Sequence, residues 1–241
     1  MAQKYNLKKR ISDGDFIIGV SAPITSTKAR IEEILGADDY GFLSVDSQHS
    51  PWSEAELVEF CGVAAELNVP VQFRIKHTRY SYQVGNFLDL GPACIEVPQV
   101  ETEETAQEAI DYFYYAQFGK RSWGGAARWG VEGRGERLEY AEWWNNHGVL
   151  WLQIESIQAV TNSRKFAKAG VDCLSWGPAD LSFSREANPN HPLQTDDDCV
   201  AYVVKQLAGT DTKLVVRSYD PALRSKYRDM GVTVLLERPK D

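Results

Sequence analysis

Two acidic side chains, Glu155 and Asp180, stand where buried β-strands are predicted to end. Glu155 lies near the end of the apolar segment 150–156, and Asp180 near the end of the segment 171–182. If these strands are neighbours in a parallel barrel, both carboxylates meet at its carboxyl end, where such barrels keep their chemistry. Two carboxylates there, with water and ligand oxygens, suit a hard divalent cation. The pattern predicts a metal-dependent enzyme, although each acid taken alone could be a helix cap or a salt-bridge partner.

Three further polar side chains are expected at the same rim. Asp46 and His49 come at or after the end of segment 42–46, and a histidine beside an acid can move a proton near neutral pH. His49 could equally serve only to cap its loop. Arg74 lies near the end of segment 69–75, where a guanidinium suits a carboxylate or a developing enolate oxygen. The alternative for Arg74 is a salt bridge to a neighbouring acid.

The segment Gly177-Pro178-Ala179-Asp180 leads away from the second acidic strand. We expect a loop here with free backbone N–H groups, and such a turn can bind an anion through its amides. Asp180 would then hold the metal while the neighbouring amides hold a substrate carboxylate.

Short apolar runs recur along the chain, and each is followed by a segment with helical periodicity. The runs are too far apart for hairpins, which is typical of repeated βα units around a parallel sheet. Ser53 and Glu56 offer a capping box, and Pro221 is well placed to open a helix. The predicted strands are 16–20, 42–46, 69–75, 94–98, 150–156, 171–182, 213–217 and 232–236, and the clearest helices are 27–35, 53–67, 81–90 and 102–115. Eight strands favour an α/β fold, a (β/α)8 TIM barrel, as a single domain over residues 1–241.

The charge of the chain excludes some classes of partner. A net charge of −8 and a sequence pI near 5.1 leave no general basic field, so nucleic acid is not an expected partner. No segment approaches the roughly 18 apolar residues of a membrane span, and no signal sequence opens the chain. We therefore expect a cytoplasmic protein that does not associate with membranes.

The cysteines are scattered, with no C-x-x-C spacing, and most fall inside apolar helix or strand patterns. This arrangement predicts free buried thiols rather than zinc ligands or disulfides. The four are Cys61, Cys94, Cys173 and Cys199.

Two stretches outside the regular pattern carry their own expectations. Segment 118–130 is rich in glycine, arginine and tryptophan, and a loop of that length is usually functional. Arg121 and Arg128 in this segment could either bind a carboxylate or stabilise the barrel.

The chain stops soon after the eighth apolar run, with too few residues for a full eighth helix. We expect a neighbouring subunit to cover that flank in a homo-oligomer.

Taken together, these residues resemble the class II pyruvate-dependent aldolases of the HpcH/HpaI family, relatives of the citrate lyase β-subunit. The resemblance runs from about Gly19 to Pro192. Its most specific pieces are Gln153-Ile154-Glu155-Ser156 and Gly177-Pro178-Ala179-Asp180-Leu181-Ser182, with His191-Pro192 downstream. The family cleaves 4-hydroxy-2-oxo acids to pyruvate, or a close 2-oxo acid, and an aldehyde, using Mg²⁺, Mn²⁺ or Co²⁺. The resemblance thus implies these substrates, a divalent metal, and a homo-oligomer, either a trimer or a hexamer.

The resemblance also implies a role for each candidate residue. Glu155 and Asp180 would ligate the metal, and Gln153 would line the metal pocket on the substrate side. Arg74 would contact the pyruvate oxygen and steady the enolate. The residues Gly177, Pro178 and Ala179 would lie against the substrate.

Two acids and a histidine complete the implied catalytic set. Asp46-Ser47-Gln48-His49 looks like the Asp-Gly-Glu-His element of the family, which makes His49 the acid or base, with Asp46 beside it and Gln48 near the substrate. Asp89, in Phe87-Leu88-Asp89-Leu90-Gly91, would pair with the catalytic histidine, either within the chain or across a subunit boundary.

The chain departs from the family pattern at three positions. Gln48 replaces the usual glutamate and Ser47 the usual glycine, so the loop around His49 loses a negative charge. The segment Val215-Val216-Arg217-Ser218-Tyr219 departs from the apolar, small-residue segment expected after the seventh strand, and Arg217 is its charged residue. It could add a second anion contact for a substrate with a distal acid group, or form a structural salt bridge.

Three alternatives to an aldolase of this type remain open from the sequence. The same site could decarboxylate oxaloacetate or a related 2-oxo acid, which needs no aldehyde pocket. It could also belong to a non-catalytic barrel that binds a carboxylate ligand after the change at Gln48. A Schiff-base route through Lys76 is less favoured, because an exposed charge beside His77 and Arg79 is the simpler interpretation.

Overall fold

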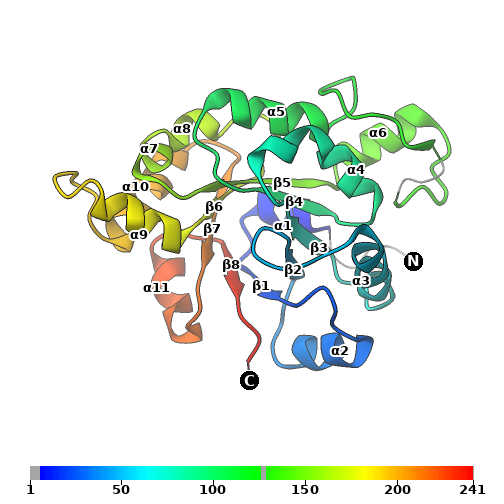
Figure 1. The fold of residues 1–241 in the computed structure, drawn as a ribbon, viewed down its shortest axis with the longest axis horizontal. Helices are drawn as coiled ribbons and strands as arrows, with labels where there is room; N and C mark the ends of the chain where they lie inside the picture. Colours follow the sequence, from blue (N-terminus) through cyan, green and yellow to red (C-terminus); the bar gives the residue numbers. More distant parts are fainter. Residues whose placement is uncertain (1–5, 126–128, 241) are drawn as a thin grey trace.

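The computed structural model describes residues 6–125 and 129–240. Eight parallel strands close into a barrel in which each strand pairs with its neighbours in sequence and the eighth pairs with the first. The helices surround this barrel (Figure 1). The predicted TIM barrel is therefore confirmed. The strands are β1 (Ile17–Ser21), β2 (Phe42–Asp46), β3 (Val71–Arg74), β4 (Cys94–Val97), β5 (Val149–Ile154), β6 (Cys173–Trp176), β7 (Lys213–Arg217) and β8 (Val234–Glu237).

The helices follow the strands in alternation, with several short helices in place of one long helix in some units. The helices of the first half are α1 (Leu7–Asp13), α2 (Lys28–Gly36), α3 (Glu54–Glu66), η1 (Thr78–Gln83), α4 (Val84–Asp89) and α5 (Glu103–Phe113). Those of the second half are α6 (Arg137–Asn145), α7 (Ile157–Thr161), α8 (Ser163–Phe166), α9 (Pro178–Glu186), α10 (Asp196–Leu207), η3 (Pro221–Leu223) and α11 (Arg224–Asp229).

Local sequence signals explain where several helices begin. The Ser53 hydroxyl accepts a hydrogen bond from the backbone N–H of Glu56, so the predicted cap of α3 is present. Pro221 opens the short helix η3, as expected. The expectation of a loop at residues 177–180 is wrong, because Pro178 opens α9 with Gly177 as its N-cap. Proline fits the first helical position, since its missing N–H would have no partner there.

The core has an inner part and an outer part. Helix α1, which sequence patterning did not predict, packs Leu7 and Ile11 against the interior of the barrel. There Phe42 and Trp151 meet edge to face, with ring centroids 5.3 Å apart. The outer part lies between strands and helices, and β5 is buried at every position because both of its faces are covered.

In the described parts of the segment 118–130, Trp123 packs on Tyr140 of α6 and Trp129 packs on Trp143 of the same helix. Arg121 is almost completely buried, and its guanidinium lies 4.9 Å from the Tyr115 ring centroid and 4.6 Å from that of Trp144. It also donates a hydrogen bond of 2.6 Å to Asp89. Of the two roles considered for Arg121, the structure therefore supports bracing the barrel. Arg128, for which the same roles were considered, lies outside the described residues.

The remaining expectations about the fold concern the cysteines, membrane-spanning segments and the side of the barrel that follows β8. All four cysteines are buried and free, as predicted. Among the described residues, no helix is both long and apolar enough to cross a bilayer. After β8, residues 238–240 run outward between α11 and α2 (Figure 1).

Candidate active site

The carboxyl ends of the strands surround a cavity of about 440 Å³. Eight residues that the sequence predicted to belong to the site line this cavity. Three more line it as well: Arg217, whose role the sequence left open, and Tyr219 and Arg238, which were not predicted. The lining residues are His49, Arg74, Gln153, Glu155, Gly177, Pro178, Ala179, Asp180, Arg217, Tyr219 and Arg238. The closed barrel brings these side chains together from strands far apart in the sequence.

Glu155 is a buried acid, with 5% of its surface exposed. It follows β5 directly, and its Oε1 accepts a hydrogen bond of 2.8 Å from the backbone N–H of Gln99. Gln99 directs that N–H inward from a left-handed backbone conformation with φ of 51°. Burial, followed by the charge of Asp180 and a hydrogen bond with it, raises the pKa of Glu155 to about 8. The two carboxylates therefore lie close enough to repel each other.

Gly177 allows this close approach of the two acids. A Cβ at position 177 would lie 2.4 Å from both the Cβ and the Oε2 of Glu155 and 3.1 Å from Nε2 of Gln153. Such a contact is too short, so only glycine fits beside Glu155. Asp180 lies in the first turn of α9, whose N-cap glycine offers no side-chain hydrogen bond to the helix. The residues of this turn line the cavity, so the positive end of the helix dipole lies at the site.

Arg74 and Asp46 form a two-point ion pair between β3 and β2. Arg74 donates from Nε to Oδ1 at 2.9 Å and from Nη2 to Oδ2 at 2.6 Å, because the two residues are direct neighbours in register. Burial of Asp46 opposes its ionisation, but the hydrogen bonds and charge of Arg74 outweigh it and lower the pKa of Asp46. The salt bridge considered for Arg74 is thus present, and Arg74 lines the cavity as well.

Two further sets of polar contacts lie inside the barrel near this pair. Arg74 Nη1 donates to the Oε1 of Gln153 at 3.3 Å. Glu96 in β4 is completely buried, and both of its oxygens accept from Nη2 of Arg217 in β7, at 2.7 and 2.6 Å. Gln72 and Ser175 also donate to Glu96. Of the two roles left open for Arg217, the salt bridge is formed.

Sequence analysis did not single out Glu96, Tyr219 or Arg238. An acid inside the apolar run Cys94-Ile95-Glu96-Val97 was a usable signal, since a buried carboxylate needs a partner. Tyr219 and Arg238 follow β7 and β8, at the rim where such barrels keep their function.

The remaining predicted residues lie in different places. His49 is exposed and lines the cavity, whereas Gln48 is partly buried and its side-chain oxygen has no hydrogen-bond partner among the described residues. Asp46 lines a neighbouring cavity of about 840 Å³. Asp89 lines a separate small cavity with its partner Arg121, and Lys76 is exposed outside the candidate site.

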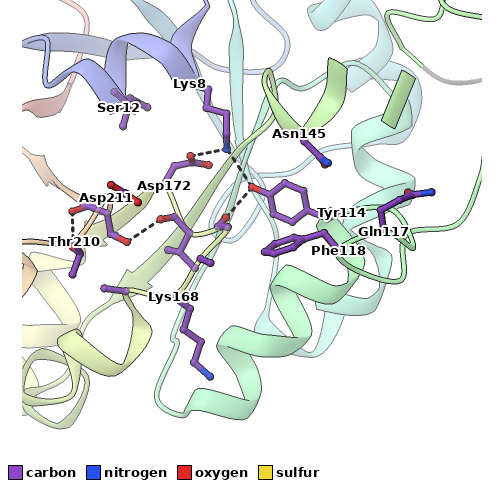
Figure 2. Close-up of a pocket in the computed structure, with 16 residues that line it drawn as sticks. Lys8, Ser12, Tyr114, Gln117, Phe118, Asn145, Lys168, Asp172, Thr210 and Asp211 are labelled. Carbon is purple, nitrogen blue, oxygen red and sulfur yellow. Dashed lines mark hydrogen bonds and ion pairs between the residues drawn. The ribbon is translucent and has the colours of Figure 1, made fainter. Parts of the chain in front are cut away.

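A cavity of about 710 Å³ lies at the other end of the barrel, beside α1 (Figure 2). Two of its charged residues, Lys8 and Asp172, form an ion pair. The Lys8 ammonium donates to Asp172 at 2.6 Å, to the Tyr114 hydroxyl at 3.2 Å and to the Gly148 carbonyl at 3.0 Å. Because Asp172 precedes β6, this network belongs to the amino ends of the strands, where side chains of such barrels serve stability.

The acids at the carboxyl rim suit one class of metal ion. Within residues 6–125 and 129–240, no third histidine, cysteine or acid joins Glu155 and Asp180 in a cluster. A pair of carboxylates leaves further coordination positions to water and substrate oxygens, as Mg²⁺ and similar hard cations require. Burial and, after it, repulsion from Asp180 raise the pKa of Glu155, and a cation between the two acids would offset both effects. The residues present therefore fit the divalent ion that the resemblance implies.

Comparison with known proteins identifies the family. The family model described as HpcH/HpaI aldolase/citrate lyase matches residues 24–212, most of the chain.

The chain belongs to the HpcH/HpaI aldolase/citrate lyase family.

Curated relatives and a solved structure agree with membership of the HpcH/HpaI family. A 2-keto-3-deoxy-L-rhamnonate aldolase of Escherichia coli K12 is 30% identical over 194 residues, covering 77% of this chain and 69% of the relative. A hydroxypyruvate/pyruvate aldolase of Paraburkholderia phytofirmans is 29% identical over 231 residues, covering 93% and 87%. The crystal structure of an HpcH/HpaI aldolase from Desulfitobacterium hafniense has the same fold, with a TM-score of 0.83 and 24% identity, over 97% of this chain and 90% of that one. The resemblance inferred from the motifs is confirmed.

Proposed function

We propose that this member of the HpcH/HpaI family is a divalent-metal-dependent aldolase of the carbon–carbon lyase class. It cleaves or forms 4-hydroxy-2-oxo acids, with pyruvate or hydroxypyruvate as one partner and an aldehyde as the other. The observation that carries the proposal is the convergence of Glu155 and Asp180 in one cavity with Arg74 and the first turn of α9. Both curated relatives named above are aldolases, which supports the same class of reaction.

Glu155 and Asp180 are the residues that hold the ion, with Mg²⁺, Mn²⁺ or Co²⁺ as candidates. When bound, the ion supplies Lewis acidity that polarises the keto group of the 2-oxo acid. The buried position of Glu155 favours binding of a cation, because burial disfavours a carboxylate without a positive partner.

The 2-oxo acid is positioned by the chain around these acids. Its carboxylate lies against the free amides of Ala179 and Asp180, where the dipole of α9 favours negative charge. Arg74 presents a guanidinium to the keto oxygen, and its pair with Asp46 fixes the orientation of that group. Negative charge that develops on this oxygen is stabilised electrostatically. Gln153 holds Arg74 from the other side.

His49 is the proposed proton carrier. Its imidazole lines the same cavity and remains open to solvent, so it can exchange protons with water between turnovers. In the cleavage direction, His49 takes the proton of the aldol hydroxyl, directly or through water. Gln48 beside it carries no charge, in place of the glutamate of the family pattern.

Proton exchange at pyruvate tests the proposal without knowledge of the aldehyde. Pyruvate is incubated in D2O with and without added Mg²⁺, Mn²⁺ or Co²⁺, and deuterium in its methyl group is measured by mass spectrometry. We expect metal-dependent exchange that Glu155→Ala and Asp180→Ala each abolish. The control Glu66→Ala removes an exposed carboxylate outside the cavity and retains exchange. Unchanged exchange in either site variant refutes the assigned metal site.

An aldehyde screen then separates the aldolase from its alternatives. Pyruvate and hydroxypyruvate are each combined with a panel of aldehydes, and addition products are quantified. Release of CO2 from oxaloacetate without any aldol product identifies a decarboxylase. Binding of pyruvate with no exchange identifies a non-catalytic carboxylate-binding barrel.

The proposal also includes a role for Asp89, an oligomeric state and a location in the cell. Asp89 lines a separate cavity with Arg121, so its proposed pairing with His49 is a contact between subunits. This pairing requires a homo-oligomer, in line with the trimer or hexamer that the family resemblance implies. A cytoplasmic location stays a prediction.

A further inference from the structure

Of the three guanidiniums that line the candidate active-site cavity, Arg238 is the one that no acid in the described part of the chain neutralises. It is the first residue after β8 and lines the candidate active-site cavity. The other two guanidiniums of that cavity are paired, Arg74 with Asp46 and Arg217 with Glu96. Among residues 6–125 and 129–240, no carboxylate forms an ion pair or hydrogen bond with Arg238. Its charge is therefore available to a ligand.

Tyr219 holds Arg238 in a defined place at the rim. The guanidinium carbon lies 4.1 Å from the centroid of the Tyr219 ring, and both side chains line the cavity. Stacking on an aromatic face orients a guanidinium and leaves the N–H groups at its edge free for two-point hydrogen bonds. Tyr219 lies two residues beyond β7 and has 54% of its surface exposed, so the pair remains accessible to a ligand.

Arg238 also forms part of the wall of a second cavity at the same rim. This cavity, of about 840 Å³, includes Asp46, whose partner Arg74 lines the first cavity. Arg238 and the Asp46–Arg74 pair thus connect the two spaces. The side chains that line the second cavity include the hydroxyls of Ser21, Thr25, Ser26 and Ser50, whereas the hydroxyl of Ser44 donates to Gln72. Hydroxyls in such number suit a ligand that itself carries hydroxyl groups.

The first substrate does not need Arg238. In the proposed function, the carboxylate of the 2-oxo acid lies against the amides of α9, beside Asp180. The keto oxygen is assigned to Arg74 and to the ion held by Glu155 and Asp180. On the second substrate, the aldehyde, His49 is assigned to the oxygen of the reacting carbon, and the end of the molecule remote from that carbon has no charged partner assigned to it.

Resting on that proposed function, we propose that Arg238 is a specificity-determining residue that binds an anionic group on the aldehyde. The group is a carboxylate or a phosphate at the end remote from the aldehyde carbon, and the hydroxylated chain between them lies in the second cavity. Tyr219 is a positioning residue that acts through Arg238.

The test compares aldehydes that differ in one anionic group. Addition of pyruvate is followed with succinic semialdehyde against butanal, and with D-glyceraldehyde 3-phosphate against D-glyceraldehyde. We expect wild-type kcat/KM to favour at least one anionic aldehyde over its neutral counterpart by about 10-fold or more. The first pair reports on carboxylates and the second on phosphates, so the two arms identify the group that is recognised.

Variants of the two rim residues test the assignment. In Arg238→Gln, the preference for the anionic aldehyde falls toward unity, whereas Arg238→Lys retains part of it because the charge remains. Tyr219→Leu raises KM for the anionic aldehyde more than it lowers kcat, since a loosely held guanidinium weakens binding. Arg228→Gln is the matched control, because Arg228 also stacks on an aromatic ring, that of Phe16 at 5.4 Å, and lies outside both cavities.

The possible failures are distinguishable. Equal losses with anionic and neutral aldehydes in Arg238→Gln, or no preference in the wild type, overturn the role of Arg238 alone. A fall in pyruvate proton exchange that matches the fall in addition would place Arg238 on pyruvate, and also overturns it. Absence of metal-dependent exchange in the wild type overturns the proposed function and this assignment with it.

Discussion

The side chain of Glu155 occupies the space that any side chain at position 177 would need, since a Cβ on Gly177 would lie 2.4 Å from Glu155 Oε2. The strand that precedes Glu155 and the helix that carries Asp180 can approach this closely only with glycine between them. The geometry of the proposed metal site thus depends on a residue that contributes no ligand.

We predict that Gly177→Ala weakens metal binding by roughly 10-fold or more, because the new methyl group displaces Glu155 from its position. Isothermal titration with Mn²⁺ measures the affinity. The control is Gly62→Ala in α3, where a Cβ meets nothing within 4 Å. Equal Mn²⁺ affinity in Gly177→Ala and the wild type would contradict the role of Gly177.

Arg74 is predicted to matter more for the chemical step than for folding. Arg74→Lys retains a positive charge but loses the two-point pair with Asp46. We expect pyruvate proton exchange to fall by roughly 10²-fold or more, as for other preorganised groups that stabilise an oxyanion. Mass spectrometry of deuterated pyruvate measures the rate, and circular dichroism checks the fold. Exchange at the wild-type rate would remove Arg74 from the mechanism.

The network at the amino end of the barrel is predicted to support stability. Lys8→Met leaves the largely buried carboxylate of Asp172 without its cation (Figure 2). Because an unpaired buried charge is costly, the free energy of unfolding should fall by about 3 kcal/mol, measured by urea denaturation at pH 7. Lys9→Met is the matched control, since its ion pair with Asp13 is exposed to solvent and should contribute little to stability. A loss at Lys8 no larger than that at Lys9 would disprove the prediction.

His147 is predicted to make stability depend on pH. It is stacked on Trp143 with ring centroids 4.6 Å apart, and neither ring nitrogen has a hydrogen-bond partner among the described residues. Burial, with smaller effects from the charges of Arg134 and Lys8, lowers the pKa of His147 to about 4. Below its ordinary pKa of about 6.5 the unfolded chain binds a proton that the folded chain does not, so stability is lost as the pH falls from 6.5 toward 4.

The variant His147→Phe isolates this effect. Phenylalanine keeps the stacking on Trp143 but does not titrate, so the stability of the variant should fall less between pH 7 and pH 4. We expect the difference between the two proteins to change by on the order of 3 kcal/mol across that range. Parallel stability curves for the two proteins would show that His147 is not the titrating group.

The sequence by itself determined the barrel and the approximate positions of its strands, and it singled out the two acids of the candidate site. The predicted strand 171–182 was too long, because β6 ends at Trp176 and Asp180 lies in α9. Strands such as β2 and β7 are covered on both faces of the sheet, so they consist of short, nearly continuous apolar runs. Such a run can be recognised from neighbouring residues in the sequence alone. Glu155 and Asp180 each follow such a run, and a charged residue at that point indicates that the strand has reached the carboxyl end of the barrel. Their motifs, Gln153-Ile154-Glu155-Ser156 and Gly177-Pro178-Ala179-Asp180, carried the family assignment that the comparison confirmed.

Tertiary structure alone decided which partners those residues have. Glu96 binds Arg217, 121 residues away, because closure of the barrel faces β4 toward β7 across its interior. No local pattern contains that contact. Helix α1 also escaped prediction, since a short helix with Leu7 and Ile11 as its buried residues is stable only against the barrel that it seals. Periodicity and charge report the burial of a residue, but the identity of its partner depends on how distant segments are brought together.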